Sequence, residues 1–371
     1  MNQSPSDAFV VPAVDIGPYV RAGGDIGPYV RAGGDIGPYV RAGEDAERAR
    51  VAREIDEACS RVGFVQILGH GIPDPVVDGL AGALDDFFGL PMDDKQQYRV
   101  VGANRGYSPP KSESLSLSLG VESASRMNDF FEAYNVGVEA RSFPHLDLSE
   151  DDYGLNVWPD VPGFEDRVQT YFIEASRVAR TLTRIFADAL GQAPGYFEQL
   201  TDHSIDVLRM NNYALPEGTV DLDGDLTGMG EHTDFGIVTV LWADRVAGLQ
   251  VLGSDGIWHD VEPLPGALLV NLGDLTARIT DDRWMSTLHR VKPPIVDGRI
   301  RRRRSVAFFH DGNVDAVVST LPEYAGPEPY EPILIRDHIK AKLAGSRHGK
   351  ANTAAVREAA RVLAATGENR A

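Results

Sequence analysis

The chain has 371 residues, of which 43% are hydrophobic and 25% charged, and its formal net charge is −19. This length corresponds to two domains or to one large domain with extensions. An acidic surface repels a phosphate backbone, so the composition argues against a nucleic-acid partner. No apolar run approaches the ~20 residues of a membrane span, and the first residues lack the features of a signal peptide. With Cys59 as its one cysteine, the chain is predicted to be a cytoplasmic globular protein with no membrane partner.

A tandem repeat lies near the N-terminus. DIGPYVRAGG occurs at residues 15–24 and 25–34, and again at 35–43 with Glu44 in place of the last glycine. Units of ten residues are too short for a common solenoid, and three copies bury little surface. We therefore interpret the repeat as a duplication that lengthens one loop, with a partner-binding arm as the alternative.

The N-terminal half has mainly helical patterns. Residues 44–63 and 74–90 are predicted helices on either side of a short buried strand, GFVQILGHGI. Residues 103–128 are rich in glycine, proline and serine and are predicted to form a loop. The clearest helix spans 163–190, where apolar residues recur at spacings of three and four and form one stripe suited to a sheet.

From residue 205 onward the pattern changes to short strands separated by turns. The predicted strands are IDVLRMNNYAL, IVTVLWA, GLQVLG, GIWHDV, ALLVNLG, TLHRVKPP and RSVAFFHD. Many short strands without intervening helices are typical of a sandwich or jelly roll. We therefore predict a boundary near residue 200 between a helical N-terminal region and a β core.

A candidate metal site begins in GEHTDFGIVTVL, residues 230–241. If this segment is one strand, His232 and Asp234 point to the same side, because alternate side chains share a face. His289, inside the strand-like STLHRV, is the candidate third ligand. Two histidines and one carboxylate form the facial triad of non-haem Fe(II) oxygenases, with zinc as the alternative metal.

A calcium site is the competing interpretation of the acidic loop DLDGDLTG, residues 221–228. A calcium loop requires glycine at its sixth position and glutamate at its twelfth. Counted from Asp221, these positions hold Leu226 and His232. We expect a turn that leads into the strand of the metal ligands.

Several segments together resemble the isopenicillin N synthase-like family of Fe(II)/2-oxoglutarate-dependent dioxygenases. In chain order they are GFVQILGHGIP, GYSPPKSESLS, NDFFEAYNVG, RMNNYALP, GEHTDFGIVTVL, NLGDL, STLHRV and RRSVAFF. The similarity runs from about residue 11 to about 342. It implies an α+β fold whose core is a double-stranded β-helix, or jelly roll, flanked by helices. The corresponding organisation is an N-terminal region at 1–200 with the repeat at 15–44, a dioxygenase core at 201–335, and a C-terminal helix and tail at 336–371.

The resemblance also implies the site residues and the reaction. The iron ligands would be His232, Asp234 and His289. Arg303 and Ser305 would bind the distal carboxylate of 2-oxoglutarate with help from the hydroxyl of Tyr213, and an arginine fork suits a planar carboxylate. With O2 as second cosubstrate, oxidative decarboxylation of 2-oxoglutarate would drive hydroxylation, desaturation or ring closure of a substrate.

The substrate itself is not encoded in a readable motif. We expect a small molecule, either a specialised metabolite or an amino-acid derivative, and a monomeric enzyme. Candidate substrate contacts are Arg105, Tyr107, Phe235 and Phe309. Two alternatives share the family's pattern: an oxidase of the isopenicillin N synthase type, which uses no 2-oxoglutarate, and an ascorbate-dependent oxidase. A catalytically inactive binding module is a third, and the intact triad argues against it.

Overall fold

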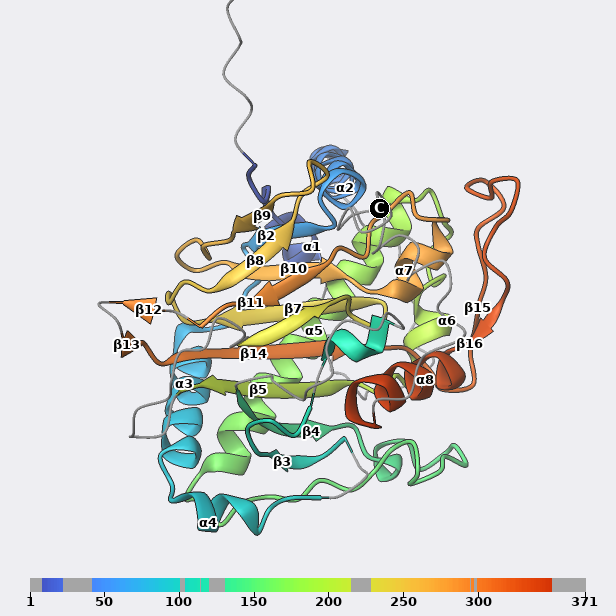
Figure 1. The fold of residues 1–371 in the computed structure, drawn as a ribbon. Helices are drawn as coiled ribbons and strands as arrows, with labels where there is room; N and C mark the ends of the chain where they lie inside the picture. The colour runs from blue at the N-terminus through green and yellow to red at the C-terminus, as the bar shows by residue number, and fades with distance from the viewer. Residues whose placement is uncertain are drawn as a thin grey trace, which may run out of the picture.

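The computed structural model of the chain describes residues 9–22, 42–100, 104–113, 115–119, 131–214, 228–293, 295–296 and 299–348. Within these residues two β-sheets face each other, and helices cover the outer side of the larger sheet (Figure 1). The second copy of the repeat, most of the third copy, most of the acidic loop and the tail beyond residue 348 lie outside the described residues.

The larger sheet has eight strands in the order β1-β2-β10-β7-β14-β5-β4-β3. All its neighbours are antiparallel except β1 and β2. In chain order its strands are β1 (Ala13–Asp15), β2 (Phe64–Leu68), β3 (Gly106–Ser108), β4 (Glu132–Gly137), β5 (Val207–Tyr213), β7 (Val238–Ala243), β10 (Leu268–Leu272) and β14 (Arg303–His310).

The smaller sheet has four antiparallel strands in the order β6-β11-β8-β9. They are β6 (Met229–His232), β8 (Leu249–Leu252), β9 (Trp258–Asp260) and β11 (His289–Val291). Two short pairs lie apart from both sheets: β12 (Ile295–Val296) with β13 (Arg299–Ile300), and β15 (Val317–Val318) with β16 (Ile333–Leu334). This pair of facing sheets is the predicted jelly roll, and the predicted fold class is confirmed.

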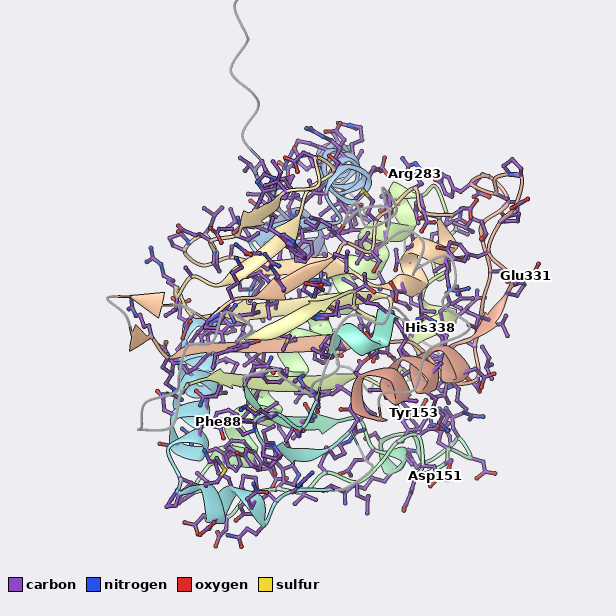
Figure 2. All side chains as sticks on the ribbon, in the orientation of Figure 1. Phe88, Asp151, Tyr153, Arg283, Glu331 and His338 are labelled. Carbon is purple, nitrogen blue, oxygen red and sulfur yellow. The ribbon has the colours of Figure 1, made fainter. Side chains whose placement is uncertain are left out.

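Helices surround the sheets. They are α1 (Gly17–Ala22), α2 (Ala42–Arg61), α3 (Asp74–Phe88), α4 (Met92–Gln96), α5 (Phe164–Ala189), α6 (Glu198–Thr201), α7 (Asp274–Ile279) and α8 (Ile335–His348), with 3-10 turns η1 (Leu115–Leu119) and η2 (Ala140–Ser142). The apolar stripe of α5 packs on β7 and β14, and α2 and α3 flank it. A second apolar cluster lies between the two sheets and includes Phe64, Tyr213 and Met229. Figure 2 shows the side chains of the described residues on these layers.

The structure changes two expectations about the strands. GEHTDFGIVTVL does not form one strand: β6 ends at His232 and β7 begins at Val238, and the two belong to different sheets. The corner between them lies close to other backbone. A side chain at Gly236 would overlap the carboxylate of Asp311, and one at Gly273 would overlap the backbone of Gly236. Glycine at both positions therefore permits this turn.

The second change concerns the boundary near residue 200. Strands β1 to β4 come from the N-terminal region, yet β2 pairs with β10 and β4 pairs with β5. The larger sheet thus continues across the predicted boundary. The division into regions at residues 200 and 335 stays a prediction about organisation along the sequence.

Candidate metal centre and active site

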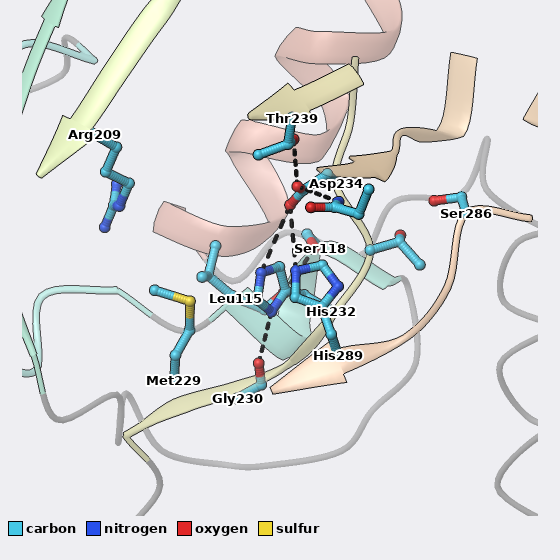
Figure 3. Close-up of polar contacts among 12 residues, drawn as sticks. Leu115, Ser118, Arg209, Met229, Gly230, His232, Asp234, Thr239, Ser286 and His289 are labelled. Carbon is cyan, nitrogen blue, oxygen red and sulfur yellow. Dashed lines mark hydrogen bonds and ion pairs between the residues drawn. The ribbon is translucent and has the colours of Figure 1, made fainter. Parts of the chain in front are cut away.

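Three predicted metal ligands converge where β6 and β11 meet. His232 ends β6, His289 begins β11, and the two are register partners across the strand pair. Asp234 lies two residues beyond β6, in the turn to β7. Its Oδ1 lies 3.7 Å from Nε2 of His232 and 3.6 Å from Nε2 of His289 (Figure 3). One potential ligand atom from each residue falls within 4.8 Å of the others.

Hydrogen bonds orient each of these side chains toward the common point. Nδ1 of His232 lies 2.8 Å from the carbonyl of Gly230, and Nδ1 of His289 lies 3.0 Å from the carbonyl of Thr287. A carbonyl requires Nδ1 to donate, so Nε2 of each ring carries the free lone pair. Oδ2 of Asp234 accepts from the side chains of Asn271 and Thr239, which leaves Oδ1 facing the histidines.

The electrostatics of the site favour a bound cation. All three side chains are buried. Burial, together with the nearby His289, lowers the pKa of His232 well below its usual range. The imidazole is therefore neutral near pH 7, which is the form that binds metals. Two imidazole nitrogens and one carboxylate oxygen match the donor set of the non-haem iron facial triad.

The triad opens into a cavity between the two sheets, with about 1000 Å³ free of protein atoms including its mouth. Alternate residues of β5 and β14 form one wall, because side chains two apart on a strand share a face. Arg303 pairs in register with Tyr213, and Ser305 pairs with Asn211. All four line the cavity.

Arg303 is the residue in this wall whose buried, unpartnered donors indicate a bound ligand. It is 2% exposed, and its guanidinium lies 5.1 Å from the centre of the Tyr213 ring. Neither Nε nor Nη1 has a hydrogen-bond partner among the described residues. Burying a charged group without partners is costly, so these donors fit an anionic ligand such as a carboxylate.

The predicted substrate contacts divide into two groups. Phe235 and Phe309 line the cavity. Arg105 and Tyr107 are absent from its wall, and their polar groups serve the fold: Arg105 donates to the carbonyls of Gly154 and Val138, and Tyr107 donates to Glu132. The prediction for these two residues is therefore not supported by their placement.

Sequence reasoning missed two parts of the cavity. Arg209 and Glu113 form a buried ion pair of 2.8 Å in its wall. Arg209 alternates along β5 with Asn211 and Tyr213, so the strand period could have placed it there. The other missed part is α8, which contributes Ile339 and Leu343, and no local motif marks it as a cavity wall.

Asp311 also lines the cavity, at the end of the alternation on β14. Burial is the largest influence on its carboxyl and raises its pKa well above the usual range, with Asp206 and Asp234 adding to the effect. A protonated carboxyl at this position can donate a hydrogen bond as well as accept one.

Comparisons with known sequences agree with this geometry. The profile described as the N-terminal region of non-haem dioxygenases in morphine synthesis matches residues 35–161, and that of the 2OG-Fe(II) oxygenase superfamily matches residues 205–312. A 2-oxoglutarate-Fe(II) type oxidoreductase of Emericella nidulans is 33% identical over 309 residues, which is 80% of this chain and 85% of that protein. Clavatol oxidase of Penicillium crustosum is 31% identical over 80% of this chain and 90% of its own length.

Solved structures give the same result. A full-length protein of Neurospora crassa, in complex with alpha-KG, superposes with a TM-score of 0.72 at 25% identity and covers 93% of this chain and 100% of its own. The dioxygenase for auxin oxidation in rice superposes with a TM-score of 0.64 at 25% identity, over 94% of this chain and 99% of that one.

A jelly roll that gathers two histidines and one carboxylate beside a cavity defines a mononuclear non-haem metal oxygenase. The chain belongs to the 2OG-Fe(II) oxygenase superfamily. It is an Fe(II)- and 2-oxoglutarate-dependent dioxygenase with O2 as the second cosubstrate, as predicted, and a small-molecule substrate fits this family. None of the helices in the described part of the chain has the length and hydrophobicity needed to span a membrane.

Proposed function

We propose that His232, Asp234 and His289 hold the iron, and that Arg303, Ser305 and Tyr213 hold the distal carboxylate of 2-oxoglutarate. The single observation that carries this proposal is the buried guanidinium of Arg303. Its Nε and Nη1 lack partners among the described residues, and it shares a cavity with the triad. A carboxylate in that position would supply two acceptors to a planar fork of donors.

Each group then has a defined task. When bound, iron and 2-oxoglutarate supply the oxidising chemistry through decarboxylation to succinate and CO2. The two histidines and Asp234 would supply three donors to the iron, which is the donor set of the facial triad. Asn271 and Thr239 fix Asp234, while Gly230 and Thr287 fix the ring orientations of the histidines. The apolar walls exclude water while substrate is bound.

Phe235 and Phe309 are proposed substrate contacts, because both line the cavity. We propose a specialised metabolite or an amino-acid derivative as substrate. Relatives whose names state such substrates support this: clavatol oxidase of Penicillium crustosum and homoarginine-6-hydroxylase of Arabidopsis thaliana. A monomeric enzyme in the cytoplasm completes the proposal, and the single, buried Cys59 is consistent with a reducing compartment.

The experiment that tests the proposal measures succinate. Purified protein with Fe(II), ascorbate, O2 and 2-oxoglutarate should release succinate slowly without any added substrate. Candidate substrates that fit the cavity should accelerate the release and yield products heavier by 16 or lighter by 2 mass units. If the iron-loaded protein neither binds 2-oxoglutarate nor releases succinate, the assignment of Arg303 and Ser305 to this cosubstrate fails.

A further inference from the structure

The register of β5 and β14 separates the cavity wall into two ends. At one end Tyr213 pairs with Arg303, and at the other Arg209 pairs with Ala307. Arg209 lies four residues from Tyr213, roughly 13 Å along an antiparallel strand. The first end is the one assigned above to 2-oxoglutarate, so Arg209 marks the end that remains for the substrate.

Arg209 is held rigidly at this end. Its Nη2 donates to Oε2 of Glu113 at 2.8 Å, and its Nε donates to Asn211 at 3.2 Å. The guanidinium also lies 5.1 Å from the centre of the Phe131 ring. Glu113 is fixed in turn, because its Oε1 accepts from Ser108 at 3.1 Å. These bonds occupy Nε and Nη2 of Arg209, and Nη1 is the guanidinium nitrogen that neither bond uses.

Apolar side chains lie near Arg209. Val207 and Phe309 are register partners next to Arg209 and Ala307, and Leu115, Ile339 and Leu343 also line the cavity. The charge of Arg209 is already compensated by Glu113. At the other end, the charges of Fe(II) and Arg303 would balance those of Asp234 and dianionic 2-oxoglutarate. Neither end therefore provides an uncompensated charge for an ionic substrate once the cosubstrate is bound.

Resting on the proposed function, we propose that the substrate is an uncharged, largely apolar small molecule whose carbonyl oxygen accepts a hydrogen bond from Arg209. Glu113 acts as a positioning residue that aims the guanidinium. A carboxylate at this point would lie beside the carboxylate of Glu113, and a cation would lie beside Arg209. A neutral amide, lactam or ketone needs only the single donor and the apolar walls.

Matched probes of different charge test the proposal. Carboxamides, carboxylates and amidines of the same rings (benzene, naphthalene and indole) differ by one charge and share their shape. Their dissociation constants are measured by ligand-observed NMR on protein loaded with Zn(II) and 2-oxoglutarate, so that no turnover is needed. We expect at least one neutral carboxamide to bind roughly tenfold or more tightly than its carboxylate and its amidine, as one charge-assisted hydrogen bond would give. Equal or tighter binding of the ionic probes, or no binding of any carboxamide, would overturn the proposal.

A paired variant then assigns the preference to Arg209. Arg209→Met with Glu113→Gln removes both charges together, so no unpaired charge is left buried. This variant should lose the preference for the carboxamide. The matched control is Lys95→Met with Glu132→Gln, which removes another buried ion pair, of 2.7 Å, outside the cavity wall. If both double variants keep the preference, or both lose it, Arg209 is not the recognition group.

Decarboxylation of 2-oxoglutarate, measured without substrate, distinguishes a failure of this inference from a failure of the proposed function. Wild-type protein that decarboxylates 2-oxoglutarate but shows no preference for carboxamides would refute the inference and retain the proposed function. Protein that prefers carboxamides through Arg209 but does not decarboxylate 2-oxoglutarate would refute the cosubstrate assignment and retain Arg209 as a recognition residue.

Discussion

His232 and His289 are register partners on neighbouring antiparallel strands, and each places its Nε2 within 3.7 Å of the same oxygen of Asp234. Strand pairing thus brings together two histidines that are far apart in the sequence. Asp234 lies outside this strand pair, in the turn that connects β6 of the smaller sheet to β7 of the larger sheet. The candidate metal centre therefore combines residues from a strand pair of the smaller sheet and from the turn toward the larger sheet.

The first prediction concerns this junction. His232→Ala or Asp234→Ala should abolish stoichiometric iron binding and turnover, because a triad reduced to two ligands loses its chelating geometry. Iron content is measured by metal analysis after gel filtration. His259→Ala is the control, since His259 also contacts a carboxylate, that of Asp255, yet lies on β9 away from the triad. Undiminished iron in both triad variants would refute the site.

The second prediction concerns the cosubstrate. Arg303→Lys keeps the positive charge but loses the planar fork. Loss of a charge-assisted hydrogen bond costs about 1.5–3 kcal/mol, so the affinity for 2-oxoglutarate should fall roughly tenfold to a hundredfold. Uncoupled decarboxylation as a function of 2-oxoglutarate concentration measures this affinity without knowledge of the substrate.

A neighbouring arginine provides the control for that experiment. Arg304 follows Arg303 on β14 but its side chain pairs with Asp85 and Asp244 instead of lining the cavity. Arg304→Lys should leave the affinity for 2-oxoglutarate unchanged. If wild-type protein shows no use of 2-oxoglutarate at all, the oxidase alternative applies, with Arg303 on a carboxylate of the substrate itself.

Much of the fold follows from periodicity in the sequence. The stripe in residues 163–190 gives α5, and the apolar runs after residue 205 give four of the eight strands of the larger sheet and three of the four strands of the smaller sheet. β4 was not predicted as a strand, and its six residues are all buried, so no alternation of polar and apolar residues marks it. The corner between β6 and β7 was also missed, because it depends on the approach of residues distant in sequence.

The site residues likewise divide into those that short sequence segments predict and those that they do not. The triad and the Arg303–Ser305 pair occur in short recognisable segments, and the structure gathers them around one cavity. Arg105 could not be placed from the sequence, because the carbonyls it binds come from other segments of the chain. Lys342 lies in a helix rich in charged residues, which local sequence alone presents as solvent-exposed, yet its side chain is fully buried.

The third prediction concerns the tandem repeat. The first copy packs against the body: Ile16 is fully buried, and Tyr19 donates to Asp188 at 2.6 Å. Deleting residues 15–34 leaves the third copy, which supplies an identical DIGPYVRAG to the same place. The 20 deleted residues equal the spacing from Ala22, which ends α1, to Ala42, which begins α2, so the first residues of α2 must supply the connection. With the packing of the first copy reproduced, the melting temperature and uncoupled decarboxylation should be nearly unchanged.

Replacing all of residues 15–44 with a Gly-Ser linker is the control for the repeat. This change removes the buried isoleucine and tyrosine, and burial of a large apolar side chain contributes about 1.5–3 kcal/mol. The melting temperature should therefore fall clearly. A comparable fall in the shorter deletion would show that the additional copies also pack against the protein.

The last prediction concerns the attachment of α8 to the metal centre. Nζ of Lys342 lies 2.7 Å from Asp274, with both side chains fully buried, and it also donates to Thr233 at 3.3 Å, between two of the proposed metal ligands. His338, on the same helix (Figure 2), lies 3.1 Å from the carbonyl of Phe235. These contacts fix α8 to the turn between β6 and β7, which contains Asp234.

Lys342→Met should destabilise the protein by about 3–5 kcal/mol in urea unfolding, because it leaves the carboxylate of Asp274 buried without its cation. Adding Asp274→Asn should restore most of that stability by removing the second charge. Iron affinity should weaken in the single variant and recover in the double variant, because the turn that contains Asp234 is positioned by the pair of Lys342 and Asp274. Lys340→Met is the matched control on α8: its ion pair with Asp152 is 55% exposed on the lysine side and should contribute at most about 1 kcal/mol. Equal effects of the two lysine substitutions on unfolding and on iron affinity would show that α8 is not fixed to the metal centre through Lys342.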